Sequence, residues 1–136
     1  MANEAVIIEL LGNKGDVINF TVADALAVPK GSIMELTDER TCILMSAADK
    51  PMAGIAASEK VANDGQTTIG LYTYGIFDLA TVAGGSAVLG ADVVSSGAGN
   101  EVDNFDTLDR ENGYVIGKSL ATGAASTVNN VLVRVF

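Results

Sequence analysis

Fifteen glycines interrupt this chain of 136 residues, so its apolar segments are short. Frequent glycine suits short strands joined by turns better than it suits long helices. Hydrophobic residues make up 49% of the chain but aromatic residues only 5%, so the core must consist mainly of Val, Ile, Leu and Ala. Because β-branched residues favour strands, the sequence predicts a mainly β domain.

Apolar runs predict the strands, and Gly, Pro, Asn and Asp residues predict the turns between them. The clearest alternation lies in residues 67–73, where Ile69 and Leu71 share one face. The other predicted strands are 6–11, 17–21, 32–37, 41–46, 52–57, 76–79, 87–89, 92–95, 114–119 and 131–136. Residues 100–112 are expected to form an exposed acidic loop.

Two parts of the chain resemble each other. Residues 31–36, a polar loop and residues 52–57 resemble residues 90–95, a polar loop and residues 115–120. Each part reads as a strand, a loop and a strand centred on glycine. The resemblance indicates either an internal structural repeat or the ordinary recurrence of strands and turns in β proteins.

The chain shows no linker, so we expect one β domain at residues 13–136, with residues 1–12 as an N-terminal arm or a first strand. The N-terminal run carries Glu4 and Glu9 and lacks the basic region of a signal peptide. Every apolar run is shorter than the ~20 residues that span a bilayer. We therefore expect a soluble protein made in the cytoplasm.

The charge and composition exclude several classes of function. The net charge of −9 opposes binding to nucleic acid or to an acidic membrane. The chain has no histidine, the commonest general acid–base residue and zinc ligand. Its single cysteine, Cys42, lies in an apolar run and is expected to be a core residue.

The remaining catalytic candidates are weak. Ser119 beside Lys118 lacks the surroundings of a serine nucleophile, and residues 84–86 and 97–99 lack the lysine and helix of a phosphate-binding loop. Four carboxylates cluster without the spacing of a calcium loop, and a solvated acidic loop explains them better than a metal site does: Asp103, Asp106, Asp109 and Glu111. The sequence predicts no catalytic residue, no metal site and no cofactor.

Six segments, taken in order, resemble the capsid decoration proteins of tailed bacteriophages, also called cement or head-stabilising proteins. They are residues 30–38 (KGSIMELTD) with Arg40 and Thr41, 51–59 (PMAGIAASE), 74–77 (YGIF), 90–95 (GADVVS), 116–121 (IGKSLA) and 133–135 (VRV). The resemblance implies a small β-barrel or β-tulip fold with short strands and long loops. It also implies a structural virion protein without enzyme activity.

In that family, subunits usually assemble as trimers on the outer surface of the head, near local threefold positions. The resemblance therefore implies that the major capsid protein is the partner. On this reading, the N-terminal run adds as an edge strand to the capsid, and its candidate contacts are Glu4, Val6, Ile8 and Leu10. An ordinary first strand of the barrel is the alternative.

Tyr72 and Tyr74 lie at period two on one face of a predicted strand. They are candidates for contact with a partner, although a half-buried sheet face explains them equally well. A second function is also considered: a carbohydrate-binding or host-adhesion module, such as the base of a head fibre. The absence of tryptophan and the presence of only three tyrosines disfavour it.

Overall fold

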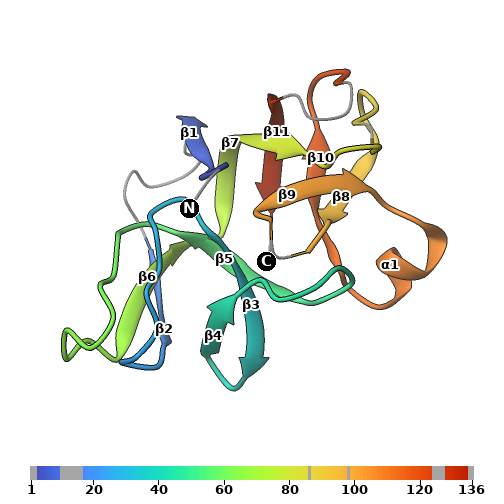
Figure 1. Ribbon diagram of the computed structural model, residues 1–136. Coiled ribbons are helices and arrows are strands. Elements are labelled where there is room, and N and C mark those ends of the chain that lie inside the picture. The colour runs from blue at the N-terminus through green and yellow to red at the C-terminus, as the bar shows by residue number, and fades with distance from the viewer. Residues whose placement is uncertain (1–2, 10–16, 86, 98, 124–127, 135–136) are drawn as a thin grey trace.

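The computed structural model describes residues 3–9, 17–85, 87–97, 99–123 and 128–134 (Figure 1). In these residues the chain forms eleven short strands and one helix, which confirms the predicted mainly β class. The elements are β1 (Val6–Glu9), β2 (Ile18–Thr21), β3 (Ile33–Asp38), β4 (Thr41–Leu44), β5 (Met52–Ala56), β6 (Thr68–Tyr72), β7 (Tyr74–Thr81), β8 (Asp92–Ser95), β9 (Glu101–Asn104), α1 (Thr107–Glu111), β10 (Val115–Ser119) and β11 (Val128–Arg134). No helix in this part of the chain is long and apolar enough to cross a membrane.

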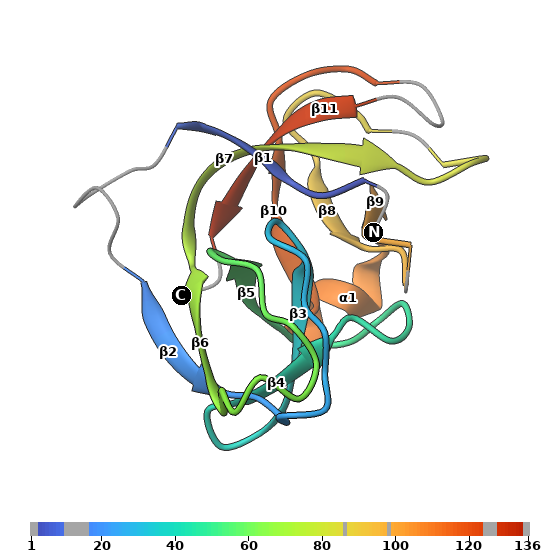
Figure 2. The same ribbon diagram turned by 60° about the vertical axis from the view of Figure 1, so that its left-hand side comes forward.

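The strands form two closed barrels that lie against each other (Figures 1 and 2). The first barrel has the cyclic order β2-β4-β3-β5-β6. The second barrel has the order β7-β11-β10-β8-β9, and parallel pairing between β7 and β9 closes it. β1 extends the sheet of the second barrel by pairing with β7. The expected small barrel fold is thus confirmed, and it occurs twice.

The two barrels have the same connectivity, strand for strand. In each barrel the first strand pairs antiparallel with the fifth and parallel with the third. The second strand pairs with the third and the fourth, and the fourth pairs with the fifth. Of the two readings that the sequence left open, the internal structural repeat is the one confirmed.

Individual hydrogen bonds recur between the barrels as well. The Gly31 amide donates to the Ala56 carbonyl, and the Gly90 amide donates to the Ser119 carbonyl, both at 2.9 Å. Gly31 and Gly90 both have positive φ, at 84° and 78°, a region that L side chains rarely adopt. The two glycines therefore make the same turn into the second strand of each barrel.

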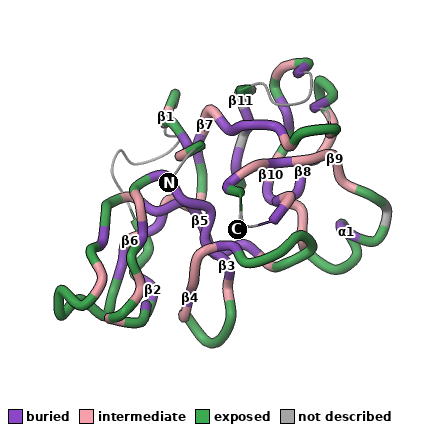
Figure 3. The backbone as a smooth tube through the Cα atoms, in the orientation of Figure 1, coloured by how far each residue is buried: buried purple, intermediate pink, exposed green. Residues whose placement is uncertain are grey.

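Side chains of β3 alternate between two cores. Met34 packs inside the first barrel, whereas Ile33 points the other way and belongs to the core of the second barrel. Met45, Met52 and Ile55 also join the second core. Burying one such side chain stabilises the fold by roughly 2 kcal/mol. The outer face of the first barrel thus completes the core of the second, and buried residues gather there in Figure 3.

One asparagine side chain joins the barrels to the N-terminal segment. Asn100 is 3% exposed, and its Oδ1 accepts a 2.6 Å hydrogen bond from the Ile33 amide. Its Nδ2 donates to the Asn3 carbonyl at 2.6 Å and to the Gly31 carbonyl at 3.2 Å. Asn100 precedes β9 with φ at 58°, a conformation that asparagine tolerates better than most residues. Both ends of its amide are therefore satisfied across three segments of the chain.

Replacing Asn100→Ala should lower the free energy of unfolding by about 3 kcal/mol, because the buried Ile33 amide loses its acceptor and the variant residue keeps a positive φ. Urea unfolding measures the change. Asn63→Ala is the matched control, since Asn63 is exposed and has φ at 59°. Equal losses in both variants would contradict a role for the Asn100 amide.

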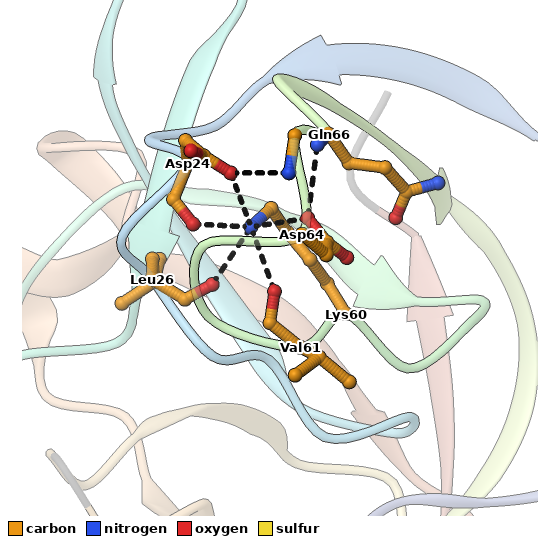
Figure 4. Close-up of polar contacts among 7 residues, drawn as sticks. Asp24, Leu26, Lys60, Val61, Asp64 and Gln66 are labelled. Atoms are coloured by element: carbon orange, nitrogen blue, oxygen red, sulfur yellow. Dashed lines mark hydrogen bonds and ion pairs between the residues drawn. The ribbon is translucent and has the colours of Figure 1, made fainter.

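A buried lysine forms hydrogen bonds that connect two loops of the first barrel (Figure 4). Lys60 is 2% exposed, and its Nζ donates to the carbonyl oxygens of Asp24, Leu26 and Val61 at 2.7, 3.1 and 3.2 Å. The same nitrogen lies 3.2 Å from Asp64 Oδ1 and 4.0 Å from Asp24 Oδ1. The buried charge is therefore compensated by carbonyls and carboxylates.

The repeat does not copy this lysine. A bridge between Val28 and Lys60 closes the first barrel's loops, and the matching bridge in the second barrel joins Ala87 to Gly123. The equivalent of Lys60 is thus a glycine. The ammonium is a feature of the first barrel alone.

The variant Lys60→Met should lose about 3 kcal/mol of unfolding free energy, because three carbonyls and one carboxylate lose their shared donor. Chemical denaturation followed by circular dichroism measures the loss. Lys50→Met changes an exposed lysine and should shift stability by less than about 0.5 kcal/mol. A Lys60 variant as stable as the Lys50 variant would show that the network contributes nothing.

The predicted acidic loop at residues 100–112 is wrong. This segment forms β9 and α1 instead. In β9 only Val102 points into the core, so the strand reads as polar. The helix has five residues, too few for an apolar period, and it is started by a capping box in which Asp106 and Asp109 each accept the other's backbone amide.

Two strand predictions also need correction. At residues 87–89 only Ala87 makes a bridge, while Val88 and Leu89 are exposed beside the turn at Gly90. The last strand begins at Val128, earlier than the expected residue 131. Isolated apolar residues at a turn have the same sequence pattern as a short strand. The first residues of β11 are mostly polar, so the apolar pattern does not reveal that the strand has begun.

Candidate functional site

The N-terminal strand β1 presents apolar side chains at the edge of the six-stranded sheet. Val6 is 56% exposed and Ile8 is 50% exposed, whereas Ile7 between them packs against the core. Glu4 is half-buried, and a backbone hydrogen bond lowers the pKa of its carboxyl. The fourth candidate contact, Leu10, lies outside the described residues. Two of the four candidates therefore form an exposed apolar pair on β1.

The segment before β1 is anchored at the junction of the barrels. Ala5 is buried, and its amide donates to the Gly31 carbonyl at 2.7 Å. A side chain at Gly31 would lie 2.6 Å from the Ala5 carbonyl oxygen, so only glycine fits. The Asn3 Nδ2 donates to Glu101 Oε1 at 3.2 Å, while its carbonyl accepts from Asn100. These contacts fix the point from which β1 starts.

Tyr72 ends β6 and Tyr74 begins β7, so the prediction that they share one face of a single strand is wrong, and their surroundings differ. Tyr72 is half-buried against the second core, with its ring centre 6.2 Å from that of Phe77. Tyr74 is 41% exposed, and the Arg134 guanidinium lies 5.9 Å from its ring centre. Tyr74 therefore offers an accessible ring, whereas part of Tyr72 is already used within the fold.

A cavity of about 420 Å³ lies where the loop after β4 meets the second barrel. Three of the four clustered carboxylates line it, namely Asp103, Asp106 and Asp109, whereas Glu111 is exposed at the end of α1. Asp49 from the first barrel also lines it. Among the described residues, no group of three or more His, Cys, Asp or Glu side chains is arranged to hold a metal ion.

Asp49 and Asp109 bring two carboxyl groups from different barrels together. Asp109 is 5% exposed and accepts the Asp106 amide at 2.6 Å. A hydrogen bond with the Asp109 carboxylate raises the pKa of the exposed Asp49 carboxyl, and nearby negative charge adds to the effect. The protonated form of Asp49 donates to Asp109, while the ionised form repels it.

This pair predicts a pH dependence of stability. Asp49 has a raised pKa in the folded state, so its stabilising contribution is full below the unfolded pKa and is lost as pH rises through the folded value. Asp49→Asn keeps a donor without the charge, so it should melt above wild type at pH 7 and together with it below about pH 4. Thermal denaturation across this range is the measurement, and a difference independent of pH would refute the pairing.

The other candidate nucleophiles, Cys42 and Ser119, are buried. Burial raises the pKa of the Cys42 thiol to about 11, so its reactive thiolate is scarce near neutral pH. The buried Ser119 hydroxyl donates to the Ala121 carbonyl at 2.7 Å. Neither residue is placed as a nucleophile.

The sequence interpretation missed the anchor residues of the N-terminal segment. Asn3 and Asn100 are 97 positions apart, and no spacing rule connects them. One usable signal was the Gly99-Asn100 pair, because glycine and asparagine often mark turns with positive φ. Asp49 gave no signal, since its partner becomes a neighbour only after the two barrels pack together.

The structure thus defines a small, mainly β protein of two barrels, with β1 as an edge strand of the second barrel's sheet. Residues 12–135 match the family of phage cement proteins, and the chain belongs to that family. It is a structural protein of the phage head that decorates and stabilises the capsid. The sequence-based recognition of the family is thereby confirmed.

A solved structure has the same fold. It is the N base of the head fibre protein gp8.5 of bacteriophage phi29, 12% identical to this chain with a TM-score of 0.55. The similarity covers 87% of this chain and 94% of the other. No curated protein matches the sequence.

Proposed function

We propose that the protein binds the outer surface of the phage head as trimers near local threefold positions, with the major capsid protein as its partner. The subunits would be made in the host cytoplasm and added to the shell from outside. A net charge of −9 supports this route, because it keeps free subunits soluble and away from nucleic acid.

The exposed pair Val6 and Ile8 on the edge strand β1 carries the proposal for the contact. An edge strand offers backbone amides and carbonyls to an extended segment of a partner, and its outward side chains add apolar burial. Glu4 remains a candidate before this strand, and Leu10 remains one from its position in the sequence. Tyr72 at the end of β6 and Tyr74 at the start of β7 remain candidates for contact with a partner.

Stabilisation follows from mass action. A protein that binds the assembled shell but not free capsid subunits lowers the free energy of the shell by its binding free energy. Three linked copies bind with an avidity gain of about 100-fold or more when all can engage at once. In this mechanism no covalent bond is made or broken.

The double variant Val6→Asp and Ile8→Asp tests this contact. It should weaken binding to heads that lack the protein by at least about 100-fold, because two charges would enter an apolar interface. Co-sedimentation with such heads measures binding. Val61→Asp changes a similarly exposed apolar residue in the loop between β5 and β6 and should bind like wild type.

Unchanged binding of the double variant, with a native circular dichroism spectrum, would rule out β1 as the contact. A deletion of residues 2–11 is less informative, because it also removes the buried Ala5 and the Asn3 contacts.

The similarity to a head fibre base keeps a second function under consideration, namely a carbohydrate-binding or host-adhesion module. Exposed aromatic rings in a shallow groove would support such a function, and Tyr74 at the start of β7 is one exposed ring. Glycan-array binding by the isolated protein, without affinity for heads, would favour this alternative over the cement role.

A further inference from the structure

The outer faces of the two barrels are equivalent in the repeat but differ in what covers them. The hydrogen bond from Gly31 to Ala56 is equivalent to the one from Gly90 to Ser119, so Ala56 corresponds to Ser119. The preceding residues, Ile55 and Lys118, therefore correspond as well. In the same way, the Ala56 amide donates to the Ser32 carbonyl and the Ser119 amide to the Ala91 carbonyl, both at 2.9 Å, so Ile33 matches Asp92. The first face is buried by the second barrel, whereas the second is exposed or half-buried.

The face of β8, β10 and β11 carries positive charge and a groove. A cavity of about 370 Å³ is lined there by Asp92, Val115, Gly117, Lys118 and Arg134. Lys118 and Arg134 are both exposed. Two of the chain's eight basic residues therefore line one groove, in a protein with seventeen acidic residues.

Neighbouring groups add one more cation and an apolar margin. The Arg110 guanidinium, from α1, pairs with Asp92 and compensates the negative charge in the groove. Leu89 and Leu120 are 64% and 40% exposed, and they flank the hydrogen bond from the Gly90 amide to the Ser119 carbonyl. The surface thus combines basic side chains with exposed apolar ones, as protein interfaces commonly do.

The covered face of the first barrel indicates what kind of element can bind the equivalent face of the second barrel. The turn between β8 and β9 contacts the covered face at the start of β3, where Asn100 is hydrogen-bonded to Ile33 and Gly31. The backbone at Gly97 approaches Ala47 and Ala48 in the same region. A turn from the second barrel therefore contacts this face, together with the core side chains of the second barrel that bury Ile33 and Ile55.

The matching turn of the first barrel lies between β3 and β4. Arg40 corresponds to Asn100, because both precede the third strand of their barrel with positive φ, at 46° and 58°. Asp38, Glu39 and Arg40 are all exposed, and this turn lies at the outer end of the first barrel in Figure 3. The Arg40 guanidinium donates back to the Asn19 carbonyl at 2.8 Å, so the tip of the turn presents two carboxylates.

We propose that copies of this chain join head to tail, with the acidic β3–β4 turn of one copy docked on the basic β8–β10–β11 face of the next. The contact uses the turn that is equivalent to the β8–β9 turn, which contacts the first barrel within one copy, and charge complementarity selects the pairing. Such a heterologous contact closes into a ring when the rotation between copies allows it. The inference deepens the proposed trimer and rests on it for the number of copies.

Charge reversal tests the contact. Lys118→Glu and Glu39→Lys should each raise the dissociation constant for self-association by about tenfold or more, and the two together should restore association. Sedimentation velocity at up to about 100 μM measures it, at low and high salt, since screening weakens such a contact. Lys50→Glu and Glu59→Lys make the same charge changes at exposed positions elsewhere and should associate like wild type.

Each other outcome overturns the proposal. These outcomes are a monomeric wild type, a Lys118 variant that associates normally, or a charge-swapped pair that associates no better than either single variant. Head binding separates this inference from the proposed function. If Lys118→Glu associates normally but loses head binding, the face contacts the shell instead. If the Val6 and Ile8 variant binds heads normally but the charge-reversal results hold, only the β1 contact fails.

Discussion

The packing of one barrel's outer face into the other barrel's core is the constraint on which the architecture depends. A barrel with few aromatic residues has little apolar volume of its own, and Ile33, Met52 and Ile55 supply what the second core lacks. The Asn100 amide fixes the register of this contact, because its hydrogen bonds reach the first barrel and the N-terminal segment together. β1 owes its position to both interactions.

Duplication explains how one fold provides surfaces of different character. At equivalent positions, the first barrel has apolar Ile33 and Ile55, whereas the second has Asp92 and Lys118. The apolar pair commits its face to a permanent contact within the chain, while the charged pair leaves its face compatible with water. A polar outer face on the last unit of a repeat prevents other apolar surfaces from stacking on it non-specifically.

Much of the fold was accessible from the sequence, because period-two patterns and turn glycines act locally. Residues 52–57 and 92–95 were placed correctly as strands, and the resemblance between the two halves pointed to the repeat. Residues 101–111 were misread, since β9 and α1 depend on one buried valine and a capping box. For the candidate site, the alternation of Val6 and Ile8 was visible locally, but the junction at Asn3 and Asn100 exists only after long-range packing.

The distance in sequence between Asn3 and Asn100 has a consequence for the order of events during synthesis. The chain emerges N-terminus first, yet one anchor of its opening segment, the Asn100 side chain, follows Asn3 by 97 positions. An incomplete or half-folded polypeptide therefore lacks the platform that holds its leading strand in place. On the proposed contact through β1, attachment to the head therefore requires the second barrel as well as the first.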